Sequence, residues 1–180
     1  IVPFGHLTED AIAVMVAARL PDNAIVCDEG VTSARRFFEL SSGAAPHDYL
    51  MNTGGSIGCG IPLATGAAVA CPDRKVINLQ ADGSGMYTVQ GLWTQARENL
   101  DVITIIFANR AYAVLHAEMR NVGVNGIGEN ARRMMNLDHP AWDWVLVAKG
   151  MGVDAAGAHS CEQFADLFES ALRRRGPFLI

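Results

Sequence analysis

The sequence lacks any apolar run of the roughly 18 residues that a membrane-spanning helix requires, and it has few charges. Only 18% of its residues are Asp, Glu, Lys or Arg, and the formal net charge is −5. Lys and Arg do not cluster with aromatic residues, which argues against a nucleic-acid surface. The one basic run, 173–175, is typical of the last turn of a helix, where cations suit the helix dipole. We therefore expect neither a membrane nor a nucleic acid as a partner.

Cysteine is also scarce, and its spacing is unlike that of metal and redox motifs. The four cysteines are scattered at Cys27, Cys59, Cys71 and Cys161, without a CxxC pair. Such cysteines are typical of reduced core residues in a cytosolic protein, so we predict a cytoplasmic location. A metal cluster is the disfavoured alternative.

An initiating Met is missing as well. The chain has 180 residues, about the size of one domain. It stops at "GPFLI", which is typical of the start of a buried strand. We interpret residues 1–180 as a single domain from a longer polypeptide.

The sequence does contain many short apolar runs, separated by stretches of helical spacing. A continuous apolar run predicts a strand that is covered on both faces of a sheet. Strand–helix alternation predicts an α/β fold, with an open, mostly parallel sheet and helices on both faces. The polar stretch 120–134 is expected to be a mobile loop. The expected strands are 24–27, 75–80, 102–108, 152–158 and 177–180, and the expected helices are 8–20, 58–70, 88–100, 140–152 and 160–176.

A polar turn, "ADGSG", follows the second predicted strand, and ligands bind at such strand ends in parallel sheets. Its acid is Asp82. Gly83 and Gly85 allow close backbone approach and expose N–H groups, and Ser84 adds a hydroxyl. A helix expected to begin near Thr88 would point its positive end at the same region. Together these features favour an anion with a divalent cation beside it.

A second oxygen donor, Asn109, follows the next predicted strand. It lies 109 − 82 = 27 residues after Asp82, a gap that one helix and one strand fill. The two side chains could therefore share one Mg²⁺, which prefers oxygen ligands. The residues alone leave the alternatives open, because an Asp before Gly is often a turn former and Asn109 could cap a helix.

The segment "ADGSGMYTVQGLWTQARENLDVITIIFANRAYAVL" resembles the thiamine-diphosphate binding motif, in which Gly-Asp-Gly is followed, after a helix and a strand, by Asn-Asn. It departs from that motif at Ala81 and Ala108. "MNTGGSIGCGIPLATGAAVACPDRKVINLQ", "WDWVLVAKGMGVDAAGA" and "RGPFLI" are similar to segments of acetolactate synthase and benzoylformate decarboxylase-like enzymes. The resemblance implies the pyrophosphate-binding domain, normally the C-terminal third of a three-domain enzyme.

The resemblance also implies roles for individual residues. Thiamine diphosphate folds into a V, and "GGSIG" would supply the Gly55 carbonyl for its amino group and the Ile57 side chain as a wedge between its rings, with Ser56 between them. An ordinary core position is the alternative for Ile57, and a helix N-cap is the alternative for Thr32. The implied Mg²⁺ ligands are Asp82, Asn109 and the Ala111 carbonyl, and the implied diphosphate contacts are Glu29, Gly30, Val31, Thr32, Gly83, Ser84 and Tyr112.

The implied activity is decarboxylation or carboligation of a 2-oxo acid, closer to acetolactate synthase than to a benzoylformate-type decarboxylase. The family's activating glutamate belongs to a pyrimidine-binding domain of the same or a partner subunit, so we assign no catalytic residue here. His116 is expected on the surface or in packing contacts. The family also implies a homodimer or homotetramer.

Two other classes remain as alternatives. A non-catalytic interaction module would keep the fold and lose the cofactor, and only the departures at Ala81 and Ala108 favour it. A dinucleotide-binding domain would show GxGxxG after the first strand, and "CDEGVTSARR" lacks that turn.

Overall fold

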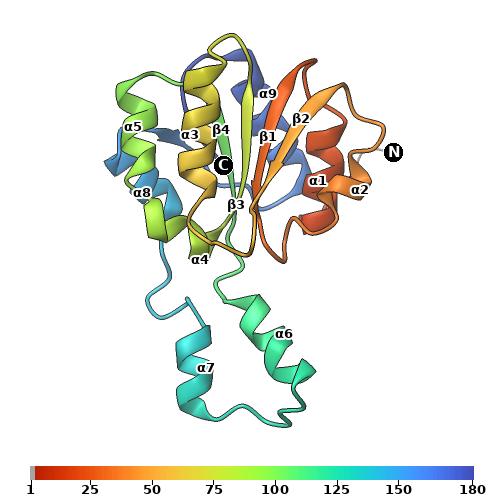
Figure 1. Cartoon of the computed structure of the whole chain (residues 1–180), viewed down its shortest axis with the longest axis vertical. Helices are drawn as coiled ribbons and strands as arrows, with labels where there is room; N and C mark the ends of the chain where they lie inside the picture. Colours follow the sequence, from red (N-terminus) through yellow and green to blue (C-terminus); the bar gives the residue numbers. More distant parts are fainter. Residues whose placement is uncertain (1–2) are drawn as a thin grey trace.

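Six parallel strands form one sheet in the computed structural model of the chain, which describes residues 3–180 (Figure 1). Their spatial order is β2-β1-β3-β4-β6-β5. This arrangement confirms the expected α/β fold with an open parallel sheet. The strands are β1 (Ala24–Glu29), β2 (His47–Met51), β3 (Val76–Ala81), β4 (Val102–Phe107), β5 (Asp154–Ala155) and β6 (Phe178–Leu179).

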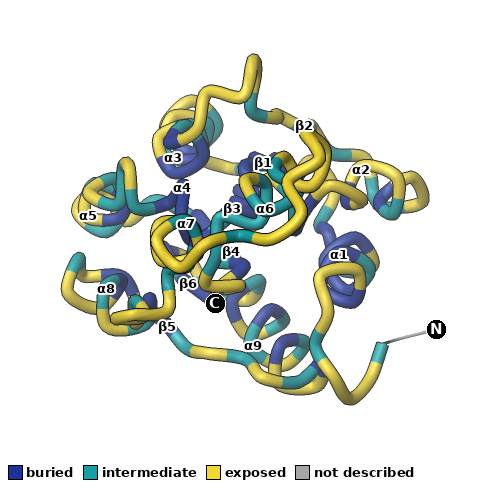
Figure 2. The backbone as a smooth tube through the Cα atoms, turned by 90° about the horizontal axis from the view of Figure 1, so that it is seen from below, coloured by how far each residue is buried: buried dark blue, intermediate teal, exposed yellow. Residues whose placement is uncertain are grey.

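Helices cover both faces of this sheet (Figure 2). The central strands are apolar on both sides because successive side chains point to opposite faces. Val26 of β1 packs in one core with α1 and α9, while Ile25 and Cys27 pack against α3 on the other face. The first layer contains α1 (Glu9–Ala17), α2 (Phe37–Leu40) and α9 (Cys161–Arg173), and the second contains α3 (Gly60–Ala70), α5 (Gly91–Arg97) and α8 (Trp144–Gly150).

The register of the central strands brings three strand ends to one edge of the sheet. Glu29 of β1 is opposite Gln80 of β3, and Ala81 of β3 is opposite Phe107 of β4. The loops that leave β1, β3 and β4 therefore start side by side. This edge is where the polar turn at Asp82 was expected to meet Asn109.

Two short elements on the side of the sheet near α1 were missed in the sequence. The strand β2 lies at the edge of the sheet, and three of its five residues are exposed. An edge strand with exposed side chains gives no continuous apolar run, so its pattern is that of a loop. The helix α2 is only four residues long, too short to show a helical period.

Three predicted elements have different bounds. The turn at Asp82 is itself helical: α4 (Asp82–Gly85) leads into a 3₁₀ helix, η1 (Met86–Thr88), so the helix expected over 88–100 begins only at Gly91, as α5. The helix expected over 140–152 begins only at Trp144, because Asp143 caps it by accepting a hydrogen bond from the Leu146 N–H. The strand expected over 152–158 is reduced to the two residues of β5.

The stretch 120–134, expected to be a mobile loop, is a loop only over 122–128; its last residues belong to a helix, and the whole forms part of a helical arm. The arm consists of α6 (Ala113–Asn121) and α7 (Glu129–Met135), and it projects away from the sheet and its covering helices (Figure 1). The sequence of α7, "ENARRMM", contains mostly good helix formers. The glycines that suggested a loop lie between the two helices, where Gly123 and Gly126 have positive φ.

Burial differs among the four cysteines, all of which are free. Cys27 and Cys161 are buried, as expected, and burial raises the pKa of the Cys27 thiol to about 12. Cys59 and Cys71 are half-buried, so describing all four as core residues was wrong.

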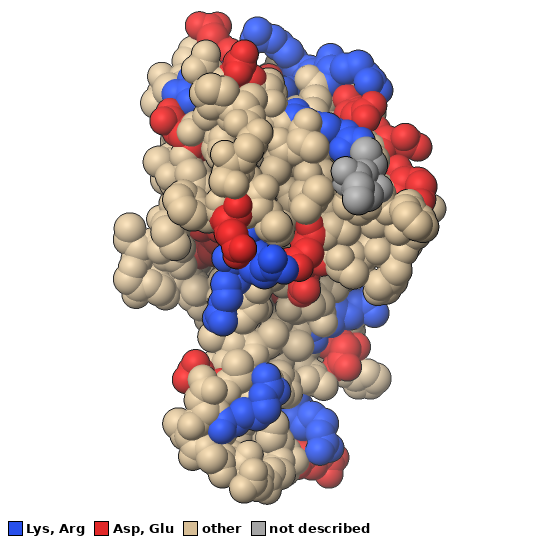
Figure 3. All heavy atoms as spheres, turned by 90° about the vertical axis from the view of Figure 1, so that its right-hand side faces the viewer, with Lys and Arg blue, Asp and Glu red and all other residues tan. Residues whose placement is uncertain are grey.

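The surface carries charges of both signs. On the face shown in Figure 3, Lys and Arg side chains are interspersed with Asp and Glu. Arg19 pairs with Glu169 at 3.0 Å, and Arg36 pairs with Asp10. None of the helices within residues 3–180 is long and apolar enough to cross a membrane.

Replacing Phe168 with Ala should destabilise the fold strongly. Phe168 is fully buried and stacks on Phe164, with ring centroids 5.8 Å apart, beneath the sheet. We expect Phe168→Ala to lower the free energy of unfolding by about 3–5 kcal/mol, because it removes apolar contacts and leaves a cavity. Urea unfolding of the chain measures this. Leu146→Ala is the control: that side chain is 66% exposed, and we expect a change of less than about 0.5 kcal/mol. Similar losses in both variants would contradict the assigned core.

Candidate functional site

Most of the predicted site residues line one small cavity at the carboxyl ends of β1, β3 and β4. Its volume is about 60 Å³. Residues from three separate strand ends and from the turn before α3 contribute to it. The predicted residues in its lining are Val31, Thr32, Ile57, Asp82, Gly83, Ser84, Asn109, Ala111 and Tyr112.

Asp82 is the buried acid of this cavity, and its residue is 3% exposed. One carboxylate oxygen accepts from the Gly83 N–H at 2.8 Å and the other from the Arg110 N–H at 2.7 Å. Arg110 has φ +57°, and this left-handed conformation accompanies the approach of its N–H to the acid. Burial raises the pKa of Asp82, and the two backbone hydrogen bonds oppose that rise. A cation beside the carboxylate would favour its ionised form.

Asn109 supplies an amide oxygen at the end of β4. Its Oδ1 accepts from the Ala111 N–H at 3.0 Å, which makes a tight turn. The N-cap of α6 is Tyr112, so the alternative reading of Asn109 as a helix cap is wrong. Thr32 is likewise not a cap, because α2 begins after Arg36.

The oxygen donors of this cavity fit a hard cation such as Mg²⁺. Asp82 and Asn109 offer side-chain oxygens, and Ala111 lines the same cavity with a carbonyl available for a third. Gly83 leaves room over the site for the Tyr112 ring, which would lie 2.5 Å from a Cβ at that position. Residues 3–180 contain no group of three or more His, Cys, Asp or Glu that could hold a metal.

A larger cavity of about 610 Å³ adjoins the small one and shares Val31, Ile57 and Val114 with it. The side chain of Ile57 is 44% exposed at this boundary, so an ordinary core position is wrong for it. The turn before it requires glycine, since Gly54 and Gly55 have φ of +64° and +66°. With Asp82, Ser84 and Asn109 in the small cavity and several apolar side chains in the larger one, the paired cavities suit a ligand with a polar head and an apolar body. The larger cavity is also lined by Asp28, Glu29, Arg35, Phe38, Tyr49, Met51, Asn52 and Gly55.

The side chain of Glu29 does not line the small cavity. It is 1% exposed and binds the first turn of α3: Oε1 accepts from the Gly58 N–H at 2.6 Å and Oε2 from the Gly60 N–H at 2.9 Å. Gln80, which sequence reasoning missed, also donates to it at 2.9 Å. Gly30 and Ser56 lie near the site without lining either cavity. The contact between Glu29 and a diphosphate therefore remains a prediction, and it concerns only the backbone of Glu29.

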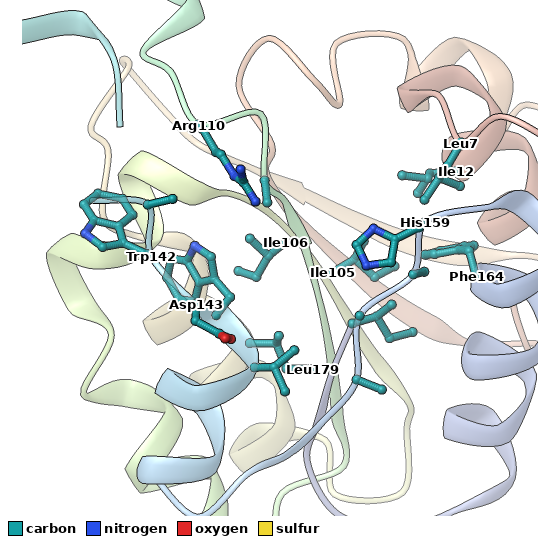
Figure 4. Close-up of a pocket in the computed structure, with 18 residues that line it drawn as sticks. Leu7, Ile12, Ile105, Ile106, Arg110, Trp142, Asp143, His159, Phe164 and Leu179 are labelled. Atoms are coloured by element: carbon teal, nitrogen blue, oxygen red, sulfur yellow. The ribbon is translucent and has the colours of Figure 1, made fainter. Parts of the chain in front are cut away.

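A third cavity, of about 540 Å³, lies at the ends of β4 and β6 (Figure 4). It holds none of the predicted cofactor residues. The Arg110 side chain enters it, beside Trp142, Asp143 and His159 (Figure 4). The backbone N–H of Arg110 thus binds Asp82 at the small cavity, while its side chain lies in the third cavity.

His116 lies on α6, outside the small cavity. Its Nε2 is 3.3 Å from Asn136 Oδ1, so it connects the start of α6 to the residue that follows α7. This contact agrees with the expectation of a packing role.

Comparisons with known proteins identify the family of this fold. The family model described as "Thiamine pyrophosphate enzyme, C-terminal TPP binding domain" matches residues 30–180. A Mycobacterium tuberculosis protein, described provisionally as an acetolactate synthase large subunit, is 48% identical over 99% of this chain and 35% of its own length. Benzoylformate decarboxylase of Pseudomonas aeruginosa is 30% identical over 98% of the chain and 32% of its own length.

A solved structure gives the same picture. The thiamine diphosphate-dependent 4-hydroxybenzoylformate decarboxylase of Rhodococcus jostii RHA1 superposes with a TM-score of 0.85 at 31% identity. The match covers 97% of this chain and 32% of that enzyme. The chain therefore spans about a third of the length of the relatives it matches.

Gly83→Ala should disturb the site through Tyr112. The added Cβ would overlap the Tyr112 ring, and such overpacking costs about 1–3 kcal/mol of folding free energy. Thermal unfolding of the chain measures the loss. Tyr112→Ala should remove most of it, because the ring is the obstacle. Gly66→Ala is the control, since open space surrounds that exposed helical glycine. A loss that persists without the Tyr112 ring would contradict this contact.

Proposed function

This chain belongs to the thiamine pyrophosphate enzymes as their C-terminal TPP-binding domain, and we propose that its paired cavities divide the cofactor between them. The small cavity takes Mg²⁺ and the diphosphate, and the adjoining cavity takes the two rings. The single observation that carries this proposal is the junction of the cavities at Ile57, with Asp82 and Asn109 on the polar side.

Each residue has a defined task in this proposal. Asp82, Asn109 and the Ala111 carbonyl hold the cation, while Gly83 and Ser84 lie at the diphosphate and Tyr112 covers it. Gly55 accepts a hydrogen bond from the amino group of the cofactor, and Ile57 separates its rings. When bound, the cofactor would supply a nucleophilic carbon for the carbonyl of a 2-oxo acid and a cationic ring to take up the electron pair released with CO₂. The chain's own residues bind and orient it, and we assign the activating carboxylate to a pyrimidine-binding domain of the same or a partner subunit.

We propose that the full protein is a three-domain enzyme that carboligates or decarboxylates 2-oxo acids. The 48% identity to the relative described as an acetolactate synthase favours carboligation. A benzoylformate-type decarboxylase is the second candidate, favoured by the 4-hydroxybenzoylformate decarboxylase structure.

A non-catalytic module is less well supported. Ala81, which replaces a motif glycine, has φ −73° and ψ 144°, an extended conformation that any residue adopts. The replacement therefore does not prevent the turn at Asp82. Asp82 and Asn109 both remain at the cavity.

Asp82→Ala should abolish Mg²⁺-dependent binding of thiamine diphosphate and leave the fold intact. Calorimetric titration of the full-length enzyme, with and without Mg²⁺, measures the binding, and circular dichroism monitors the fold. Asp22→Ala is the control, since that exposed carboxylate lies in the loop before β1, at the opposite edge of the sheet. Normal cofactor affinity in Asp82→Ala would show that the metal site is wrongly assigned.

We propose a homodimer or homotetramer that associates partly through the arm. Leu115, Val122 and Met134 are 45%, 75% and 77% exposed, and an apolar hollow of about 410 Å³ separates α6 from α7. Light scattering of the chain at high concentration should show association, because exposed apolar surface of this kind favours burial. Met134→Glu should weaken it, whereas Val69→Glu on α3 should not. A monodisperse monomer at high concentration would contradict this proposal.

A further inference from the structure

Glu29 and Gln80 form a buried polar pair between the two turns that bound the cavities. They face each other in the register of β1 and β3, and they are 1% and 0% exposed. Two polar side chains at such depth cost folding free energy unless hydrogen bonds compensate. Their contacts therefore show what they hold in place.

Glu29 holds the turn that carries Ile57. Its carboxylate accepts from the backbone N–H groups of Gly58 at 2.6 Å, Cys59 at 3.1 Å and Gly60 at 2.9 Å. These are the residues that follow Ile57 directly and begin α3. Gly60 has no room for a side chain, since a Cβ there would lie 2.3 Å from Gln80 Oε1 and 2.8 Å from Glu29 Cβ.

Gln80 connects Glu29 to the turn that carries Asp82. Its Nε2 donates to Glu29 Oε2 at 2.9 Å and to Ser84 Oγ at 2.8 Å. An ionised carboxylate only accepts hydrogen bonds, so the Gln80 amide must present its nitrogen to Glu29. This orientation leaves Gln80 Oε1 buried without a partner, a cost that the two hydrogen bonds offset.

We propose that Glu29 and Gln80 are positioning residues that fix Ile57 relative to the diphosphate turn. This Glu29–Gln80 bridge runs from the first turn of α3 to Ser84, and the hydrogen bonds of both side chains go to these two turns and to each other. It sets the separation between the wedge and the Mg²⁺ ligands, and so selects the folded form of thiamine diphosphate. The inference rests on the proposed cofactor site and adds to it the residues that determine its geometry.

The test compares two ligands of the full-length enzyme, each with Mg²⁺: thiamine diphosphate and inorganic pyrophosphate. Pyrophosphate has no rings, so it does not contact Ile57. In Glu29→Gln an amide nitrogen must face a backbone N–H of the α3 turn, which weakens the hold on that turn. We expect the dissociation constant for thiamine diphosphate to rise about tenfold, while that for pyrophosphate, measured by competition, stays within about twofold.

Gln80→Met is the second variant, and it keeps all three backbone hydrogen bonds of Glu29 if Glu29→Gln fails to fold. It should give the same selective loss. Gln95→Met is the matched control: Gln95 is a 1% exposed amide that bonds Thr65 of α3 at 3.0 Å and has no part in the bridge. It should leave both dissociation constants unchanged.

A double-mutant cycle with Ile57→Ala locates the effect. Once the wedge is absent, Glu29→Gln should have little further effect on thiamine diphosphate, because coupled residues are not additive. Equal losses of affinity for both ligands, or normal affinity for thiamine diphosphate in both bridge variants, would overturn the inference. Neither result would contradict the proposed cofactor site. If the wild-type enzyme bound neither ligand, the cofactor site would be wrong and the inference would fall with it.

Discussion

The parallel pairing of β3 with β1 on one side and β4 on the other is the constraint on which the site depends. It places Glu29 opposite Gln80 and Ala81 opposite Phe107, so the turns that follow start level with one another. A slip of one residue would turn Gln80 to the opposite face of the sheet, away from Glu29. Buried side chains on both faces, such as Ile77 and Val76 of β3, fix this register.

Two buried carboxylates near this edge have different surroundings. Glu29 receives three backbone N–H groups and an amide, which complete its hydrogen bonding. Asp82 receives two backbone N–H groups, and burial still raises its pKa. Glu29 thus finds its hydrogen-bond partners within the chain, whereas a cation beside Asp82 would favour the ionised form of that carboxyl. The two acids therefore differ in the number of donors that the protein itself places around them.

Much of the fold could be predicted from the sequence, because β1, β3 and β4 are continuous apolar runs and α9 has a regular apolar stripe. The edge strand β2 was missed because its side chains are largely exposed, and α7 was missed because the glycines before it outweighed its helix formers. Asp82, Gly83, Ser84 and Asn109 could be proposed from their positions at strand ends, whereas the other candidate site residues came from a resemblance to a family. The link from Glu29 to Gln80 could not be predicted, because it joins residues 51 positions apart through side chains that only the folded sheet brings together.

Backbone hydrogen bonds connect the base of the arm to the segment that carries the proposed metal ligands. Tyr112 donates its N–H to Met135 at 2.8 Å, Leu137 donates to Arg110 at 2.7 Å, and Ala111 pairs with Asn136. The strand of backbone that enters the arm is thus bonded to the strand that leaves it, right beside Asn109 and Asp82. If these residues hold a cation as proposed, a partner that binds the arm and shifts this backbone would change the affinity for the cation. By thermodynamic linkage, the cation would then change the affinity for that partner by the same factor.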